Sequence, residues 1–121
     1  MKKPPKSKAW DILYKNYAKK DIDIILKLRK SSPDFVNEVI GNFGLGVLWR
    51  RQILNDREKQ IVVLASLITQ GCIDDELRRH LHTALKRGLS RKEIKEIPLL
   101  LSGYIGIPRC LKAMLLIAET L

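Results

Sequence analysis

The sequence predicts an all-α protein, an antiparallel bundle of about six helices, from three observations. Glycines and prolines separate segments whose apolar residues recur at helical spacing, and no segment reads as a strand. Aromatic residues make up 6% of the chain although 45% of it is hydrophobic, so the core must be aliphatic, which suits helices packed on helices. Capping boxes at 55–58 and 90–93 mark the starts of two helices.

The length of 121 residues is that of a single domain. We expect residues 1–8, which hold four lysines, to form a basic flexible tail, and residues 9–121 to form one helical domain. No apolar run approaches the ~20 residues of a membrane span. The basic start is not followed by the apolar segment of a signal peptide. We therefore expect a cytoplasmic protein without membrane contact.

Three helices are predicted in the first half of the chain. The first runs from about Ala9 to Lys19, and the second ends near Lys30. The third begins with Ser32 as N-cap and Pro33 at the first helical position, a common helix start. The middle of this third segment is expected to be irregular, because it holds three glycines, Gly41, Gly44 and Gly46.

The second half predicts four helices with clear boundaries. Asn55 and Ser90 each lie three residues before a glutamate, so each opens a capping box. Between them a helix from about Asp74 to Arg87 ends at Gly88. Two prolines complete the pattern. Pro98 should kink the helix that it interrupts, and Pro108 lies in the first turn of the last helix.

Two of these helices, at about 56–70 and 107–121, are apolar on nearly every side. Such helices lie at the centre of a bundle or in an interface between subunits. A chain this small cannot cover both, so we expect a homo-oligomer.

The chain is strongly basic, with 23 Lys and Arg against 13 Asp and Glu and a net charge of +10. This excess suits an anionic small molecule, nucleic acid, or simply solubility. Because the basic residues alternate with acidic ones along the helices, they are typical of solvated faces. We therefore do not expect nucleic-acid binding.

Both histidines of the chain lie in the helix at about 74–87. His80 shares an inward stripe with Leu77 and Leu81, whereas His82 lies about 200° round the helix and faces solvent. Glu76, four residues before His80, is close enough to hold the tautomer of the imidazole. The same pattern also fits a histidine that is merely part of the core, and spacing alone does not decide between them.

Other kinds of site find little support. Glu76 and His80 offer two metal ligands and nothing nearby completes a set, so we expect no metal and no cofactor. The glycines at 41–46 do not follow a strand, which excludes a dinucleotide-binding loop, and a nucleophile elbow is also absent. Cys72 and Cys110 lack a CxxC or metal-ligand spacing and read as free thiols.

Three stretches in order resemble the carboxymuconolactone decarboxylase family, over roughly Phe35 to Leu121. They read LNDREKQIVVLASLITQG, DELRRHLHTALKRGLSRKEIKEI and YIGIPRCLKAMLLIAETL. The most specific parts are the ELxxH pattern at 76–80, the GLSRKEIKEI segment, and Tyr104-x-Gly-Ile-Pro. Each is weak alone, but their order and spacing together are hard to obtain by chance.

The resemblance implies an alkyl hydroperoxidase D-like helical fold assembled as trimers or hexamers, and decarboxylation of 4-carboxymuconolactone. His80 would be the proton donor or acceptor, and Glu76 the acidic residue one turn earlier. Arg51 would bind a substrate carboxylate, and Tyr104 is the second expected substrate-binding residue. Loss of CO2 leaves a carbanion or dienolate that must be stabilised and reprotonated.

Departures from the family pattern keep two other functions open. The redox branch of the fold uses cysteines seven and four residues before the histidine, where this chain has Ile73 and Glu76. An oxidoreductase would have to use Cys72 or Cys110 instead. A non-catalytic oligomer that binds an acidic partner or RNA is the other alternative, because several polar family positions are changed here, namely Phe43, Val47, Lys86 and Arg87.

Overall fold

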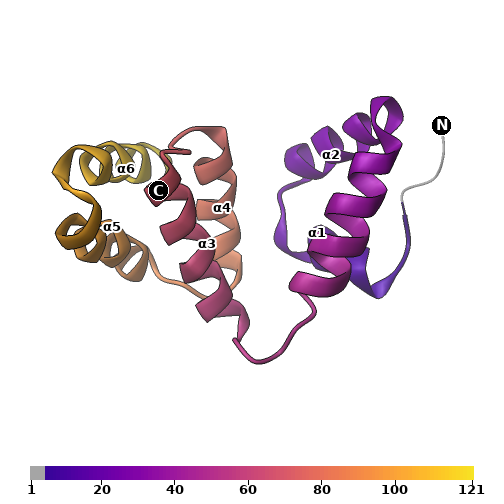
Figure 1. The fold of residues 1–121 in the computed structure, drawn as a ribbon, viewed down its shortest axis with the longest axis horizontal. Helices are drawn as coiled ribbons and strands as arrows, with labels where there is room; N and C mark the ends of the chain where they lie inside the picture. The colour runs from indigo at the N-terminus through magenta and orange to yellow at the C-terminus, as the bar shows by residue number, and fades with distance from the viewer. Residues whose placement is uncertain (1–4) are drawn as a thin grey trace. The chain divides into compact units, whose positions relative to one another are not determined.

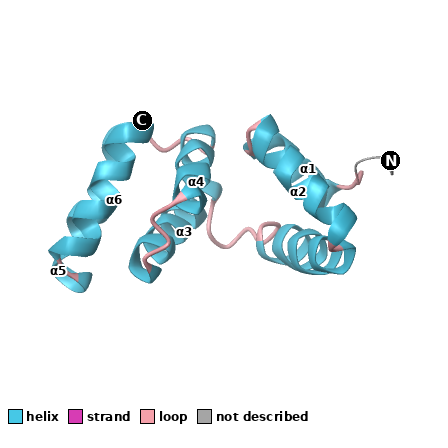
Figure 2. Cartoon of the chain, turned by 90° about the horizontal axis from the view of Figure 1, so that it is seen from above, coloured by secondary structure: helices cyan, strands magenta, loops and turns pink. Residues whose placement is uncertain are grey.

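The computed structural model describes residues 5–121, and every regular element in that range is a helix (Figure 1). Figure 2 shows that the loops are the connections between helices and a short segment before the first helix. The chain divides into two compact units, of which the first ends at Ile53 and the second is Leu54–Leu121. The all-α prediction is confirmed for the described residues.

The predicted tail falls only partly within the described chain, because residues 1–4 lie outside it. Lys8 already begins the first helix, whose N-cap Ser7 accepts a hydrogen bond from the Trp10 N–H at 3.2 Å. The flexibility of the tail and the single domain over 9–121 stay predictions.

The described residues of the first unit, 5–53, form three helices around a small core of their own. Its buried apolar residues are Trp10, Leu13, Val36 and Leu45. Asn16 is also buried and donates to the carbonyl of Ile12 at 2.8 Å, which satisfies its amide nitrogen. The helices are α1 (Lys8–Asn16), α2 (Lys19–Ser31) and the π-helix η1 (Phe35–Leu48).

The glycine-rich segment forms one continuous helix with wide turns rather than an interrupted one. Its hydrogen bonds span five residues, as in the bond from the Trp49 N–H to the Gly44 carbonyl at 3.0 Å. A Cβ on Gly44 would lie 3.2 Å from the Val39 carbonyl oxygen, so glycine permits this close backbone approach. A Cβ on Gly41 would lie 3.0 Å from the indole ring of Trp10.

The second unit holds four helices whose predicted caps are confirmed. Asn55 with Glu58, and Ser90 with Glu93, form complete capping boxes. Gly88 has φ +94° at the predicted helix end, a conformation that favours glycine. The helices are α3 (Asp56–Gln70), α4 (Asp75–Lys86), α5 (Arg91–Ile105) and α6 (Ile107–Thr120).

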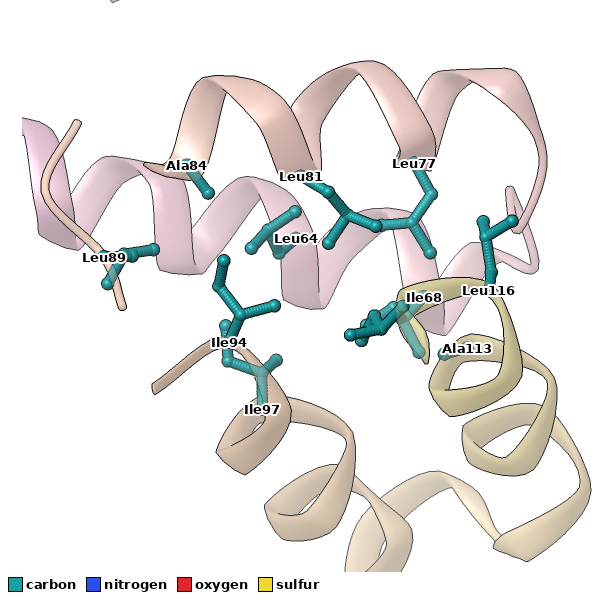
Figure 3. Close-up of a cluster of buried hydrophobic side chains, with 11 residues drawn as sticks. Leu64, Ile68, Leu77, Leu81, Ala84, Leu89, Ile94, Ile97, Ala113 and Leu116 are labelled. Atoms are coloured by element: carbon teal, nitrogen blue, oxygen red, sulfur yellow. The ribbon is translucent and has the colours of Figure 1, made fainter. Parts of the chain in front are cut away.

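One aliphatic cluster joins these four helices (Figure 3). Each helix contributes side chains that are almost fully removed from water, a burial that stabilises the unit by roughly 1.5–3 kcal/mol for each large side chain. Pro98 is also buried, inside an α5 that continues to Ile105. The cluster consists of Leu64, Ile68, Leu77, Leu81, Ala84, Leu89, Ile94, Ile97, Ala113, Leu116 and Ile117.

Between residues 5 and 121 no helix is both long and apolar enough to cross a membrane.

Candidate functional site around His80

The position of His80 follows from the amphipathic pattern of α4. Asp74 caps this helix by accepting a hydrogen bond from the Glu76 N–H at 2.9 Å. Leu77 and Leu81 are fully buried in the core, as the inward stripe predicts. His80 lies at the edge of that stripe, and 14% of its side chain is exposed. The imidazole is therefore held by the core and still reaches the surface.

Glu76 lies beside His80, one turn earlier on the same helix. Its Oε2 is 3.9 Å from the imidazole Nε2, a distance that suits an ion pair but is too long for a hydrogen bond. Its Oε1 accepts a hydrogen bond from the Arg79 guanidinium at 2.5 Å. The carboxylate is about half exposed, so it shares its charge among His80, Arg79 and water.

The sequence prediction missed Gln60, whose side chain approaches the ring from another helix. Gln60 lies on α3 and is completely buried. Its Nε2 is 3.3 Å from His80 Nδ1 and 3.1 Å from the His80 carbonyl oxygen. A signal was present: Gln60 precedes the buried Leu64 and Ile68 by four and eight residues. A lone amide in such an apolar row needs polar partners.

The structure brings together two of the four predicted site residues, Glu76 and His80. Tyr104 lies near the end of α5 with 82% of its surface exposed. Arg51 follows η1 in the first unit, where it is exposed and its N–H donates to the Leu48 carbonyl at 3.4 Å. Arg51 and His80 thus belong to different units of the chain.

The four positions that depart from the family pattern have different surroundings. Arg87 is not a surface cation, because 3% of its side chain is exposed and its guanidinium lies 3.3 Å from an Asp56 oxygen. It joins the end of α4 to the start of α3 and so has a structural role. The other three residues, Phe43, Val47 and Lys86, are exposed.

The two cysteines do not form a redox pair in this structure. Both are free, and they lie on different elements, Cys72 after α3 and Cys110 in α6. Cys110 is buried and Cys72 is half-buried. Over residues 5–121, no three His, Cys, Asp or Glu side chains come close enough to hold a metal ion.

Comparison with known proteins places the chain in one family. The model of the carboxymuconolactone decarboxylase family matches residues 36–119. The chain is 36% identical over 87 residues to the 4-carboxymuconolactone decarboxylase of Acinetobacter baylyi, covering 72% of this chain and 63% of that protein. It is 30% identical over 84 residues to a nitrosuccinic acid decarboxylase of Metarhizium robertsii, covering 69% and 58%. The chain thus spans less than two thirds of the length of either relative. It belongs to the carboxymuconolactone decarboxylase family.

Proposed function

We propose that this protein is a carboxy-lyase that removes CO2 from a small anionic lactone or related carboxylate, with His80 as proton donor or acceptor. The observation that carries the proposal is the setting of His80 in a chain of this family. Its imidazole lies between the buried amide of Gln60 and the carboxylate of Glu76, and 14% of the side chain still reaches the surface.

The chemistry of decarboxylation explains why such a histidine is useful. The C–C bond to the carboxylate breaks, CO2 leaves, and the electron pair stays on the substrate as a carbanion or dienolate. A donor near this charge stabilises it, and a proton must reach the carbon. Imidazole suits this task because it exchanges protons near neutral pH. Glu76 supports it by stabilising the imidazolium.

The substrate class follows from the names of the two relatives. One is named for a lactone acid and the other for a nitro acid. Both compounds combine a carboxylate with a group that can accept electrons. We propose that Arg51 binds a substrate carboxylate through charge-assisted hydrogen bonds and that Tyr104 contributes a further contact. The net charge of +10 favours the approach of an anion.

We further propose that the chain acts as a homo-oligomer, a trimer or a hexamer. Apolar side chains at helical spacing remain exposed along α5 and α6, with Leu100 and Tyr104 on the first and Leu111 and Leu115 on the second. Exposed apolar stripes of this kind mark protein–protein contact. A second copy of the chain would cover them.

The function is tested by measuring CO2 release from 4-carboxymuconolactone and from nitrosuccinate. We expect turnover of at least one probe, and a loss of about 10²-fold or more in kcat for His80→Gln. His82→Gln is the matched control on the same helix and should keep full activity. Turnover that survives in His80→Gln would rule out the role given to His80. Absence of turnover on both probes would rule out this substrate class.

A further inference from the structure

The orientation of the Gln60 amide follows from the backbone of His80. A carbonyl oxygen only accepts hydrogen bonds, so the Gln60 atom 3.1 Å from the His80 carbonyl must be the amide nitrogen. The same nitrogen lies 3.3 Å from His80 Nδ1. Its two hydrogens can serve these two acceptors together. The reverse orientation would place two oxygens against each other.

We propose that Gln60 is a positioning residue that holds neutral His80 in the tautomer protonated at Nε2. A nitrogen that receives an N–H donor must offer its lone pair, so Nδ1 carries no proton in the neutral ring. The single ring proton is then on Nε2, the nitrogen that faces Glu76. This proposal rests on the proposed function for its catalytic meaning, although not for its geometry.

A second feature of Gln60 supports this role. Among the described residues, its Oε1 is buried without a hydrogen-bond partner. An unsatisfied buried acceptor costs about 1–3 kcal/mol, whereas an apolar side chain of similar volume would avoid that cost. Gln60 therefore does not fill the core in the most stable way. Breaks in local packing rules of this kind are typical of functional sites.

The tautomer decides what His80 offers first to a substrate. With the proton on Nε2, the resting imidazole presents an N–H rather than a lone pair on the side of Glu76. It can donate a hydrogen bond to the substrate oxygen that gains negative charge as CO2 leaves. It cannot accept a substrate proton at that nitrogen. The resting His80 therefore acts as a hydrogen-bond donor in the decarboxylation step, because Gln60 holds the ring proton on Nε2.

The test is ¹⁵N NMR of the histidine rings in the full chain, with Gln60→Glu and Gln60→Leu as variants. The chain has two histidines, so His82→Gln assigns the signals. Spectra are recorded near pH ~8.5, about two units above the ordinary pKa of histidine. We expect the proton of His80 on Nε2 in the wild type. In Gln60→Glu it should move to Nδ1, because a carboxylate only accepts. In Gln60→Leu both tautomers should appear.

Two further measurements separate this inference from the proposed function. Gln70→Leu is the matched control, since Gln70 is an exposed amide on α3 that bonds to Ser66, and its loss should leave the His80 signals unchanged. Gln60→Glu should also lower kcat at least about tenfold, because a catalytic histidine in the wrong tautomer is impaired.

The NMR result needs no substrate, so it stands or falls independently of turnover. A proton on Nδ1 of wild-type His80 would overturn the inference. So would identical His80 spectra in the wild type and in every Gln60 variant that folds. If Gln60→Glu does not fold, Gln60→Leu carries the test, because leucine has a similar volume without a donor. A tautomer change in these variants together with full turnover in His80→Gln would refute the proposed function and leave the tautomer assignment in place.

Discussion

Arg57 in the first turn of α3 binds Glu93 in the first turn of α5 through two guanidinium nitrogens. The same guanidinium donates to the carbonyl oxygen of Gly88, which lies just before α5. Glu93 is also the third residue of α5, where it completes the capping box by accepting a hydrogen bond from the Ser90 N–H at 2.9 Å. The Glu93 carboxylate thus joins α3 to α5 and also caps the N-terminus of α5.

This contact predicts acid sensitivity of the fold. The hydrogen bond from Arg57, with that from the Ser90 N–H, lowers the pKa of Glu93 from 4.5 to about 2. A carboxyl whose pKa is lower in the folded state stabilises the fold above its unfolded pKa, and that stabilisation is lost as pH falls. We expect the Tm advantage of the wild type over Glu93→Gln to be present at pH 7 and to shrink between about pH 4.5 and 2.

Thermal unfolding followed by circular dichroism checks this prediction. Glu96→Gln is the matched control, because Glu96 is an exposed glutamate on the same helix. Its Tm should follow that of the wild type at every pH. A gap between wild type and Glu93→Gln that stays constant down to pH 2 would show that Glu93 does not carry the effect.

Two Gly→Ala changes should alter stability in opposite directions. Gly41→Ala places a Cβ 3.0 Å from the Trp10 ring, so overpacking should destabilise the fold by about 1–3 kcal/mol. A Cβ on Gly103 meets nothing within 4 Å, and alanine favours the helix there by up to about 1 kcal/mol. Urea unfolding of both variants measures the two free energies. Equal effects would contradict the close approach at Gly41.

Arg51→Ala should raise KM for the substrate that the enzyme decarboxylates, while kcat changes little. Loss of a hydrogen bond to a charged group costs about 1.5–3 kcal/mol, which corresponds to at least about a tenfold rise in KM. Steady-state kinetics provide the measurement. Arg50→Ala, which removes the neighbouring exposed arginine, is the matched control and should leave KM unchanged. Equal KM values in both variants would place the carboxylate contact elsewhere.

Leu111→Lys should weaken self-association. Leu111 is 56% exposed, and Leu115, one turn later, is 61% exposed. A lysine in this stripe would bring a charge into an apolar interface, whereas Lys112→Ala removes an exposed charge next to it. Light scattering at micromolar concentration should show an oligomer for the wild type and for Lys112→Ala, and smaller species for Leu111→Lys. A monomeric wild type would refute the proposed assembly.

The sequence by itself determined the helices and their ends in the second unit. These features are local: Asn55 reaches a backbone N–H three residues away, and Gly88 supplies a positive φ within its own turn. The inward stripe of α4 also follows from local periodicity, so spacing alone placed His80 among the inward positions. That 14% of its side chain is exposed at the edge of the core came from the structure. The glycine-rich segment was harder to predict, because its close contacts, backbone against Gly44 and the Trp10 ring against Gly41, are not visible in the sequence.

Only the tertiary structure decided what touches His80. Glu76, four residues away, was the expected partner of the ring, and the structure places it at ion-pair distance. Gln60 is 20 residues earlier on another helix and approaches the ring more closely. Spacing along one helix predicts neighbours on that helix, whereas contacts across helices depend on how α3 and α4 pack. That packing sets which ring nitrogen of His80 receives a hydrogen bond.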